Sequence, residues 1–267
     1  MIPPGGPAGS AGRSVDDAVD NTADEAWLRT RLVAALSATG AGLLLDLDGT
    51  LVLSEETHRR AYRRYFASRG WSVDDAVLAQ FSGRRAQEVF PTLDGPWRGE
   101  DPVALTTAVL TTLAELVDAG ERPVEVPGAA RALAAASRGG VPMAVVTSAR
   151  RTWADRVLEA LGAPRGLHLV TAEDCEHGKP DPEPYRRGAQ TLGLGAGRLV
   201  ALEDAPAGVR SARAAGVGLV VGVTTSLGPA PLLGAGAHAC APDLRLLAEV
   251  LETRRPQPGP ADRRRPL

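Results

Sequence analysis

The amino-acid sequence predicts an α/β fold: a doubly wound parallel sheet of Rossmann-like type that carries an inserted α-helical cap. Three observations predict it. Short apolar runs bounded by Gly, Pro or Asp recur along the chain, helical stretches separate the later runs, and the interval between the first run and the second contains no comparable run. Buried parallel strands read as continuous apolar runs, and their alternation with helices indicates a sheet covered on both faces.

We therefore expect residues 23–52 and 128–253 to form the catalytic core and residues 53–127 to form the cap. The two ends of the chain, residues 1–22 and 254–267, are rich in Pro, with Gly and Ala in the first and Arg in the second. Segments of this composition bury too little apolar surface to fold, so we expect both to be disordered.

The core elements follow in chain order. An amphipathic helix is predicted over residues 24–38, where Trp27, Leu28, Leu32 and Leu36 recur near helical spacing. The apolar runs predict five strands, at residues 42–45, 141–146, 167–170, 199–202 and 217–221.

Two of the connecting helices have recognisable ends. One is predicted from Asp181-Pro182 to Gly193, and the other from Pro206 to Gly216. Pro suits the first helical turn and Gly suits the position just past the last one.

The cap is expected to be helical. One face of a helix predicted over residues 55–69 carries His58, Tyr62, Tyr65 and Phe66, and arginines occupy the opposite face. Ser54 stands at its N-cap position. Further helices are predicted over residues 73–80, 84–90 and 102–119.

Composition limits the function. The net charge of −2 and the pI near 6.1 provide no global positive field, so nucleic acid is not an expected partner. No segment has the apolar length of a signal peptide or of a membrane span, which favours a cytoplasmic protein without a membrane partner.

The two cysteines, Cys175 and Cys240, are too few for a disulfide framework and do not have the spacing of metal ligands. We expect a monomer or a weak dimer.

Polar groups follow four of the predicted strands, where ligands of doubly wound sheets bind. Asp46-Leu47-Asp48-Gly49-Thr50 follows the first, Thr147-Ser148 the second, Lys179 the third and Glu203-Asp204 the fourth. Taken singly, each segment has an ordinary alternative: a turn capped by Asp, a solvated strand end, a surface charge and a helix cap. A calcium loop is excluded for the first, because oxygen ligands and the required Gly are absent at the later positions.

Lys179 is distinctive because it is the single lysine of a chain whose other basic residues are arginines. Lysine is a compact point charge on a slim stem, whereas arginine is a wide fork. A cramped site that touches both an aspartate and a phosphate would require lysine.

These motifs resemble those of the haloacid dehalogenase superfamily. DLDGTL begins at Asp46, VVTSA surrounds Thr147, GKPDPEPY begins at Gly178 and LEDAPAGV begins at Leu202, in the family's order. The residues of the last two motifs, and the insert directly after DLDGTL, are similar to those of sugar-phosphate and polyol-phosphate phosphatases, which are relatives of β-phosphoglucomutase. The resemblance implies a mobile helical cap and a small phosphorylated metabolite as substrate.

The resemblance and the residue chemistry imply the same reaction. Asp46 attacks phosphorus and becomes an aspartyl phosphate, and Asp48 protonates the leaving alkoxide and then activates water. Lys179 and Thr147 bind the phosphoryl oxygens, with Gly49 and Ser148 as further phosphate contacts.

Magnesium is the expected cofactor, because carboxylate oxygens and water are the ligands it prefers. Its expected ligands are Asp46, Asp204 and the main-chain carbonyl of Asp48, with Glu203 acting directly or through a water molecule.

The cap is expected to select the substrate. Ser54 and His58 are expected near the leaving group, and Arg84 and Arg85 follow Gly83 in a segment similar to the substrate-facing loop of the family. His58 is equally well interpreted as a packing residue, because it lies on an apolar helix face. Arg150 is expected to meet a second anionic group or to remain a surface arginine.

Leu53 departs from the family, since many relatives carry Asp at this position. Because Leu53 lies at the hinge between core and cap, the detailed hinge geometry of the family and a close analogy of substrate are not expected to carry over to this chain.

Two other functions use the same residues. A β-phosphoglucomutase-type enzyme would return the phosphoryl group to a second hydroxyl of the sugar instead of water. A non-catalytic protein that binds a phosphorylated metabolite would need neither Asp48 nor Lys179.

Overall fold

The computed structural model describes residues 21–121 and 123–254. The disorder expected for residues 1–22 and 254–267 therefore lies outside the described residues, except at the two edges. At the first edge, helix α1 (Asn21–Ser37) already begins at Asn21. At the second, the Arg254 side chain is anchored, because it donates hydrogen bonds to the carbonyls of Leu36 at 2.8 Å and Gly139 at 2.9 Å.

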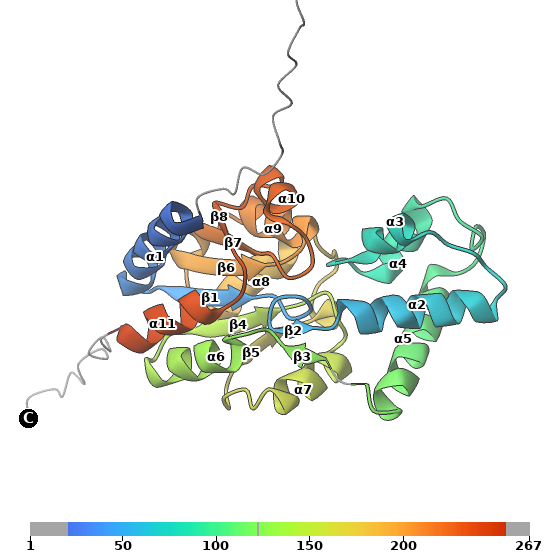
Figure 1. Ribbon diagram of the computed structural model, residues 1–267, viewed down its shortest axis with the longest axis horizontal. Coiled ribbons are helices and arrows are strands. Elements are labelled where there is room, and N and C mark those ends of the chain that lie inside the picture. The colour runs from blue at the N-terminus through green and yellow to red at the C-terminus, as the bar shows by residue number, and fades with distance from the viewer. Residues whose placement is uncertain (1–20, 122, 255–267) are drawn as a thin grey trace, which may run out of the picture.

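A six-stranded, all-parallel sheet forms the core, in the order β5-β4-β1-β6-β7-β8 (Figure 1). Its strands are β1 (Gly42–Leu45), β4 (Met143–Val146), β5 (His168–Val170), β6 (Leu199–Glu203), β7 (Leu219–Val223) and β8 (Ala239–Ala241). The five predicted strands are present, with β4 and β7 beginning two residues later than expected. The sixth, β8, was not predicted, because its sequence is short and only partly buried.

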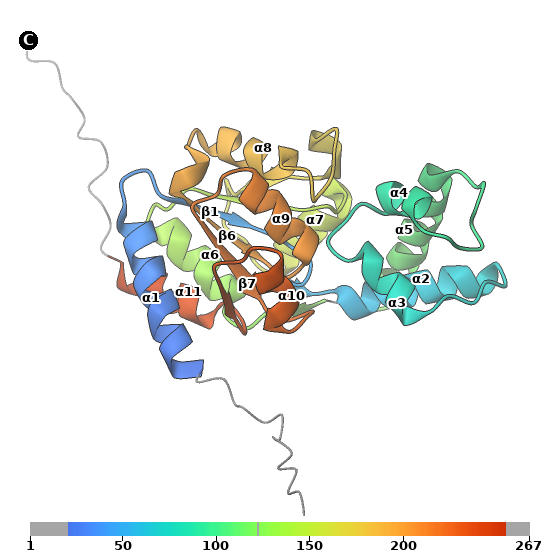
Figure 2. The ribbon, with the colours of Figure 1, turned by 90° about the horizontal axis from the view of Figure 1, so that it is seen from above.

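Helices cover both faces of the sheet (Figure 2). Strand β1 shows why: Leu43 and Leu45 pack into one apolar cluster, and Leu44 packs into the other. The first cluster contains residues of α1, α6 (Ala129–Arg138), α7 (Arg151–Ala160) and α11 (Arg245–Thr253). The second contains residues of α8 (Glu183–Leu192), α9 (Pro206–Ala214) and α10 (Pro229–Gly234). This two-sided burial is the physical basis of the doubly wound architecture.

The expected apolar face of α1 is confirmed for three of its four residues. Leu28, Leu32 and Leu36 are buried against the sheet, whereas Trp27 is 42% exposed. The Trp27 ring instead lies on the outer surface, where the Arg31 guanidinium stacks 5.1 Å from its centroid.

A group of helices between β1 and β4 extends from one end of the sheet (Figure 2). It comprises α2 (Glu55–Ser68), α3 (Asp75–Leu78), α4 (Ala86–Val89) and α5 (Pro102–Asp118), with 3-10 turns at Ala79–Phe81 and Phe90–Thr92. This is the predicted helical cap. An antiparallel pair that was not predicted, β2 (Val52–Leu53) with β3 (Val124–Glu125), forms its two connections to the core.

The cap has an aromatic interior of its own. The Phe66 and Trp97 rings stack with centroids 5.3 Å apart, and the Phe81 and Phe90 rings meet edge to face at 4.9 Å. Among residues 21–121 and 123–254, no helix is both long enough and apolar enough to cross a membrane.

Candidate active site

Five polar residues converge at the carboxyl edge of the sheet. Asp46 follows β1, Thr147 follows β4, Glu203 ends β6, Asp204 follows it, and the loop after β5 supplies Lys179. All five side chains are buried. They meet because β1 lies between β4 and β6, and because adjoining parallel strands end at the same edge.

The Lys179 ammonium lies at the centre of this group. Its Nζ donates to Asp46 Oδ1 and to Glu203 Oε1, both at 2.5 Å, and to the Val146 carbonyl at 2.9 Å. Burial alone would lower the pKa of Lys179, but the Asp46 and Glu203 carboxylates outweigh it and raise the pKa above its usual value. Lys179 therefore remains charged and offsets two buried carboxylates.

Tyr185 fixes the Glu203 carboxylate, because its hydroxyl donates to Glu203 Oε1 at 2.7 Å. Gly208 in α9 leaves the space for this carboxylate, because a Cβ atom at Gly208 would lie 1.9 Å from Glu203 Oε1. Sequence reasoning missed both residues as parts of the site, although they lie within the GKPDPEPY and LEDAPAGV motifs.

Asp46, Glu203 and Asp204 form an acidic cluster in which one carboxylate oxygen from each lies within 4.8 Å of the others. Burial, followed by the charge of Glu203, raises the pKa of Asp46 to about 8. Burial and the charge of Asp46 likewise raise the pKa of Asp204 well above its usual range. Three buried carboxyl groups face one ammonium here, so Asp46 and Asp204 hold a proton more tightly than exposed carboxyl groups do unless a second cation compensates their charge.

The cluster fits a divalent cation. Glu203 Oε2 and Asp204 Oδ1 are buried without a hydrogen-bond partner, which is costly unless a cation or water satisfies them. Gly49, with a φ of 85°, keeps this space open, since a Cβ atom there would lie 2.0 Å from Asp204 Oδ2. The all-oxygen donor set is the kind that Mg²⁺ prefers.

Asp48 lies beside this cluster and faces the cap. Its Oδ1 accepts hydrogen bonds from Ser54 Oγ at 2.5 Å and from Trp153 Nε1 at 2.9 Å, and His58 Nδ1 lies 4.0 Å away. Ser54 stands at the N-cap position of α2 as expected, but its hydroxyl makes no cap hydrogen bond. Asp48, His58 and Trp153 line a cavity between cap and core that also reaches Asp46 and Thr147.

Comparison with known proteins identifies the family. The model of the haloacid dehalogenase-like hydrolases matches residues 41–216 of this chain. The chain belongs to that family. The expected family and the expected enzyme class are thereby confirmed, and the four motifs fall within the matched range.

Two similar proteins are named as phosphatases, and a third was solved in complex with a sugar bisphosphate. Validoxylamine A 7'-phosphate phosphatase of Streptomyces hygroscopicus subsp. limoneus is 37% identical over 221 residues, which cover 82% of this chain and 98% of the relative. Hexitol phosphatase A of Escherichia coli (strain K12) is 37% identical over 177 residues, covering 66% and 79% of the two chains. The crystal structure of CbbY from Rhodobacter sphaeroides in complex with xylulose-(1,5)bisphosphate superposes with a TM-score of 0.64 at 25% identity, covering 77% of this chain and 95% of CbbY.

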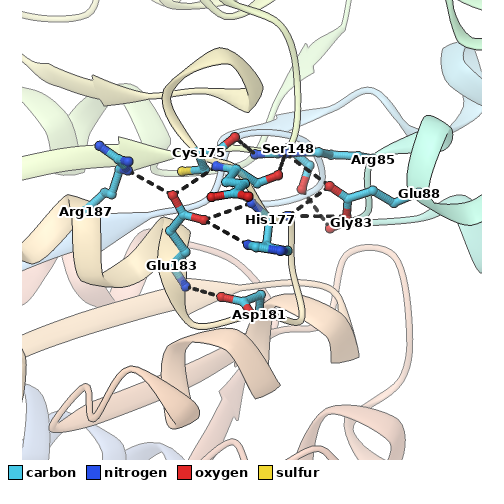
Figure 3. Close-up of polar contacts among 11 residues, drawn as sticks. Gly83, Arg85, Glu88, Ser148, Cys175, His177, Asp181, Glu183 and Arg187 are labelled. Atoms are coloured by element: carbon cyan, nitrogen blue, oxygen red, sulfur yellow. Dashed lines mark hydrogen bonds and ion pairs between the residues drawn. The ribbon is translucent and has the colours of Figure 1, made fainter. Parts of the chain in front are cut away.

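In this haloacid dehalogenase-like hydrolase, the segment before α4 docks on the core. Arg85, which was expected to contact substrate, lines the cavity, and its guanidinium also donates to protein. The acceptors are Glu88 Oε1 and the Glu176 carbonyl at 3.1 Å and the Cys175 carbonyl at 3.2 Å. Figure 3 shows Arg85 beside Glu88 and Cys175. Only 6% of Arg85 is exposed. Arg85 therefore joins the cap to the core at one wall of the cavity, and its contact with substrate stays a prediction.

Glu88 completes this contact from the cap. Its carboxylate accepts the Gly178 backbone N–H, with Oε1 at 3.0 Å and Oε2 at 3.2 Å. Gly178 directly precedes Lys179, so the cap holds the loop that carries the central ammonium. Glu88 was not predicted as part of the site.

Two further predicted residues take part in contacts inside the hydrolase. Ser148 Oγ donates to the Gly83 carbonyl at 3.0 Å, which links the second motif to the cap. Thr147 Oγ1 accepts the Ala149 backbone N–H at 3.0 Å and so keeps its own hydroxyl proton for another acceptor. Arg84 and Arg150 line the cavity.

Proposed function

We propose that this hydrolase is a Mg²⁺-dependent phosphatase that hydrolyses a small sugar- or polyol-phosphate monoester through an aspartyl-phosphate intermediate. The observation that carries the proposal is the Lys179 ammonium, which is held 2.5 Å from Asp46 beside the acidic cluster. The relatives named as phosphatases of validoxylamine A 7'-phosphate and of hexitol phosphates support the substrate class.

Asp46 provides the nucleophile. One of its carboxylate oxygens forms a bond to phosphorus while the bond from phosphorus to the ester oxygen breaks, which gives an acyl phosphate and an alcohol. Asp48 donates the proton that the departing alkoxide takes up. Asp48 then accepts a proton from the water that attacks the acyl phosphate, so inorganic phosphate leaves and both carboxyl groups return to their starting states.

The remaining groups offset charge. The Thr147 hydroxyl donates to a phosphoryl oxygen, with the Ser148 and Gly49 main chain nearby. The three N–H groups of Lys179 are directed to Asp46, Glu203 and the Val146 carbonyl, so Lys179 binds a phosphoryl oxygen by exchanging one of these acceptors for it. Its charge reduces the repulsion between Asp46 and its anionic target. Asp46, Asp204 and the Asp48 carbonyl would hold Mg²⁺, with Glu203 acting directly or through water, and the bound cation would supply further positive charge near the phosphoryl group.

The leaving alcohol would occupy the cavity between cap and core. His58, Arg84 and Arg150 line its walls, together with Tyr62 and Trp153. Aromatic rings can pack on the carbon face of a sugar or cyclitol, and the arginines can bind hydroxyl or anionic groups.

The cytoplasmic location and the monomeric or weakly dimeric state stay predictions.

A substrate screen tests the proposal. Phosphate release is measured with Mg²⁺ from hexose, pentose, polyol and glycolate phosphates and from validoxylamine A 7'-phosphate. We expect turnover of at least one cyclic or polyol ester by the wild type and none by Asp46→Asn, because an amide cannot form the acyl phosphate. Turnover by folded Asp46→Asn at the wild-type rate would contradict the assigned nucleophile.

The same preparation separates the two alternatives. Conversion of β-glucose 1-phosphate to glucose 6-phosphate, without release of free phosphate, would assign the mutase reaction. Binding of esters without any product would assign a non-catalytic binding protein.

A further inference from the structure

The carboxylate of Asp48 is fixed through one of its two oxygens. Ser54 Oγ and Trp153 Nε1 both donate to Oδ1, from 2.5 Å and 2.9 Å. Ser54 precedes the first cap helix, whereas Trp153 lies in the first turn of core helix α7. The two donors therefore hold the same oxygen from opposite sides of the boundary between cap and core.

Trp153 is itself held in place. It is 8% exposed and belongs to the apolar cluster under α7. Its ring meets the His58 ring edge to face, with centroids 5.3 Å apart, on the cavity side. A buried ring in the first turn of a helix has little freedom, so the direction of its N–H is set by the fold.

The indole N–H differs from the Ser54 hydroxyl in one chemical respect. A hydroxyl can donate or accept, whereas an indole N–H only donates. An oxygen that accepts from Trp153 must present a lone pair there and cannot direct its own proton at the ring nitrogen. A proton carried by Asp48 is consequently favoured on Oδ2.

We propose that Trp153 is a positioning residue that keeps Oδ1 of Asp48 as an acceptor and so makes Oδ2 the oxygen that exchanges protons with the leaving group and with water. The inference rests on the proposed acid–base role of Asp48 and deepens it. Trp153 acts through Asp48 and makes no bond to the reacting atoms.

The test compares leaving groups. Expulsion of an alkoxide needs a proton from the general acid, whereas p-nitrophenolate leaves without one. With enzyme in excess and Mg²⁺ present, the rate of alcohol release in the first turnover is measured for the preferred sugar or polyol phosphate and for p-nitrophenyl phosphate. We expect Trp153→Phe to slow the alkyl ester by about 10- to 100-fold, within the range that a general acid contributes, and the aryl ester less than about 3-fold. In steady-state turnover, KM should change little for either ester, because Phe keeps an aromatic ring on the cavity wall.

Trp97→Phe is the matched control. Trp97 is also buried and donates its indole N–H, to the Phe90 carbonyl at 3.1 Å, but it lies in the cap interior. Its replacement should leave the ratio of alkyl to aryl rates at the wild-type value. Equal slowing of both esters by Trp153→Phe would overturn the inference, because general damage to packing slows both.

Asp48→Asn separates this inference from the proposed function. If Asp48→Asn slows alkyl esters selectively and Trp153→Phe does not, only the role of Trp153 is refuted. If Asp48→Asn shows no selectivity, the acid–base role of Asp48 fails and the Trp153 role fails with it. Should Trp153→Phe not fold, site-specific replacement of Trp153 by 3-benzothienylalanine keeps the ring shape and removes the N–H, and the same selective slowing is expected.

Discussion

The Lys179 Nζ atom lies 2.5 Å from Glu203 Oε1, and neither side chain has any exposed surface. Removing one partner of a buried ion pair leaves a charge without compensation, which typically costs about 3–5 kcal/mol. We expect Lys179→Met to lower the free energy of unfolding by roughly that amount, measured by urea denaturation at neutral pH. The double variant Lys179→Met/Glu203→Gln should recover part of the loss.

An exposed arginine provides the control for this prediction. Arg98 pairs with Asp94 on the cap surface, where both side chains are largely exposed. Arg98→Met should change stability by less than about 1 kcal/mol, because exposed pairs contribute little. A similar small effect for Lys179→Met would show that the buried pair is not needed for stability.

Gly208 can be tested by adding a single methyl group. A Cβ atom there would overlap the Glu203 carboxylate, so Gly208→Ala must displace the acceptor of Lys179 and Tyr185. Overpacking of this kind costs about 1–3 kcal/mol, and we expect a matching fall in thermal stability together with reduced turnover. Gly195→Ala is the control, because nothing lies within 4 Å of its added Cβ and its φ is −69°. An unchanged Gly208→Ala enzyme would contradict the packing argument.

Arg85→Ala tests whether the cap holds the Lys179 loop. The variant loses three hydrogen bonds, two of them to the Cys175 and Glu176 carbonyls, and hydrogen bonds of charged groups contribute about 1.5–3 kcal/mol each. We expect faster hydrogen exchange at residues 175–178 and about a 10-fold lower kcat with KM changed less than about 3-fold. Arg84→Ala, which alters the cavity wall, should raise KM without changing that exchange. A rise in KM alone for Arg85→Ala would show that Arg85 contacts substrate and does not hold the loop.

Glu183 links the stability of this loop to pH. Its carboxylate accepts the backbone N–H groups of His177 at 2.8 Å and Glu176 at 2.9 Å, and these bonds lower its pKa from 4.5 to about 2. A lowered pKa in the folded state stabilises the protein above pH 4.5, and this contribution is lost as the pH falls toward 2. We expect the stability advantage of wild type over Glu183→Gln in urea to be full at pH 6 and to shrink between about pH 4.5 and pH 2. Parallel pH curves would contradict this role.

Magnesium binding can be measured without turnover. A ligand that binds only the folded state at about 100 times its Kd stabilises it by about 2.7 kcal/mol. We expect Mg²⁺ to raise the Tm of the wild type and to leave that of Asp204→Asn nearly unchanged, because Asp204 contributes an unpartnered oxygen to the acidic cluster. NaCl at equal ionic strength controls for screening. An equal rise in both proteins would place the cation elsewhere.

Short elements mark the limit of what could be predicted for the fold. Strands of four or five buried residues, such as β1 and β6, were evident as apolar runs. The β2 and β3 pair of two residues each gave no such signal, because its stability comes from pairing between segments far apart in the chain. Trp27 shows the same limit in a helix, since near-helical spacing did not decide whether its ring met the core.

The site shows a similar division. Asp46, Thr147, Lys179 and Asp204 could be proposed from four motifs because the carboxyl ends of adjoining parallel strands share one edge. Trp153 and Glu88 could not, because neither belongs to one of the four motifs, and only the packing of cap and core sets them against Asp48 and Gly178.

The sequence by itself determined the chemistry that this protein carries: a carboxylate pair and an acidic dipeptide at the ends of apolar runs, and a single lysine in the loop after another. Tertiary structure alone decided which atoms those groups contact. It directed Arg85 to main-chain carbonyls, and it set the Trp153 indole against Asp48. The physical reason is that strand periodicity is a local property of the chain, whereas hydrogen-bond partners are chosen by packing between distant segments.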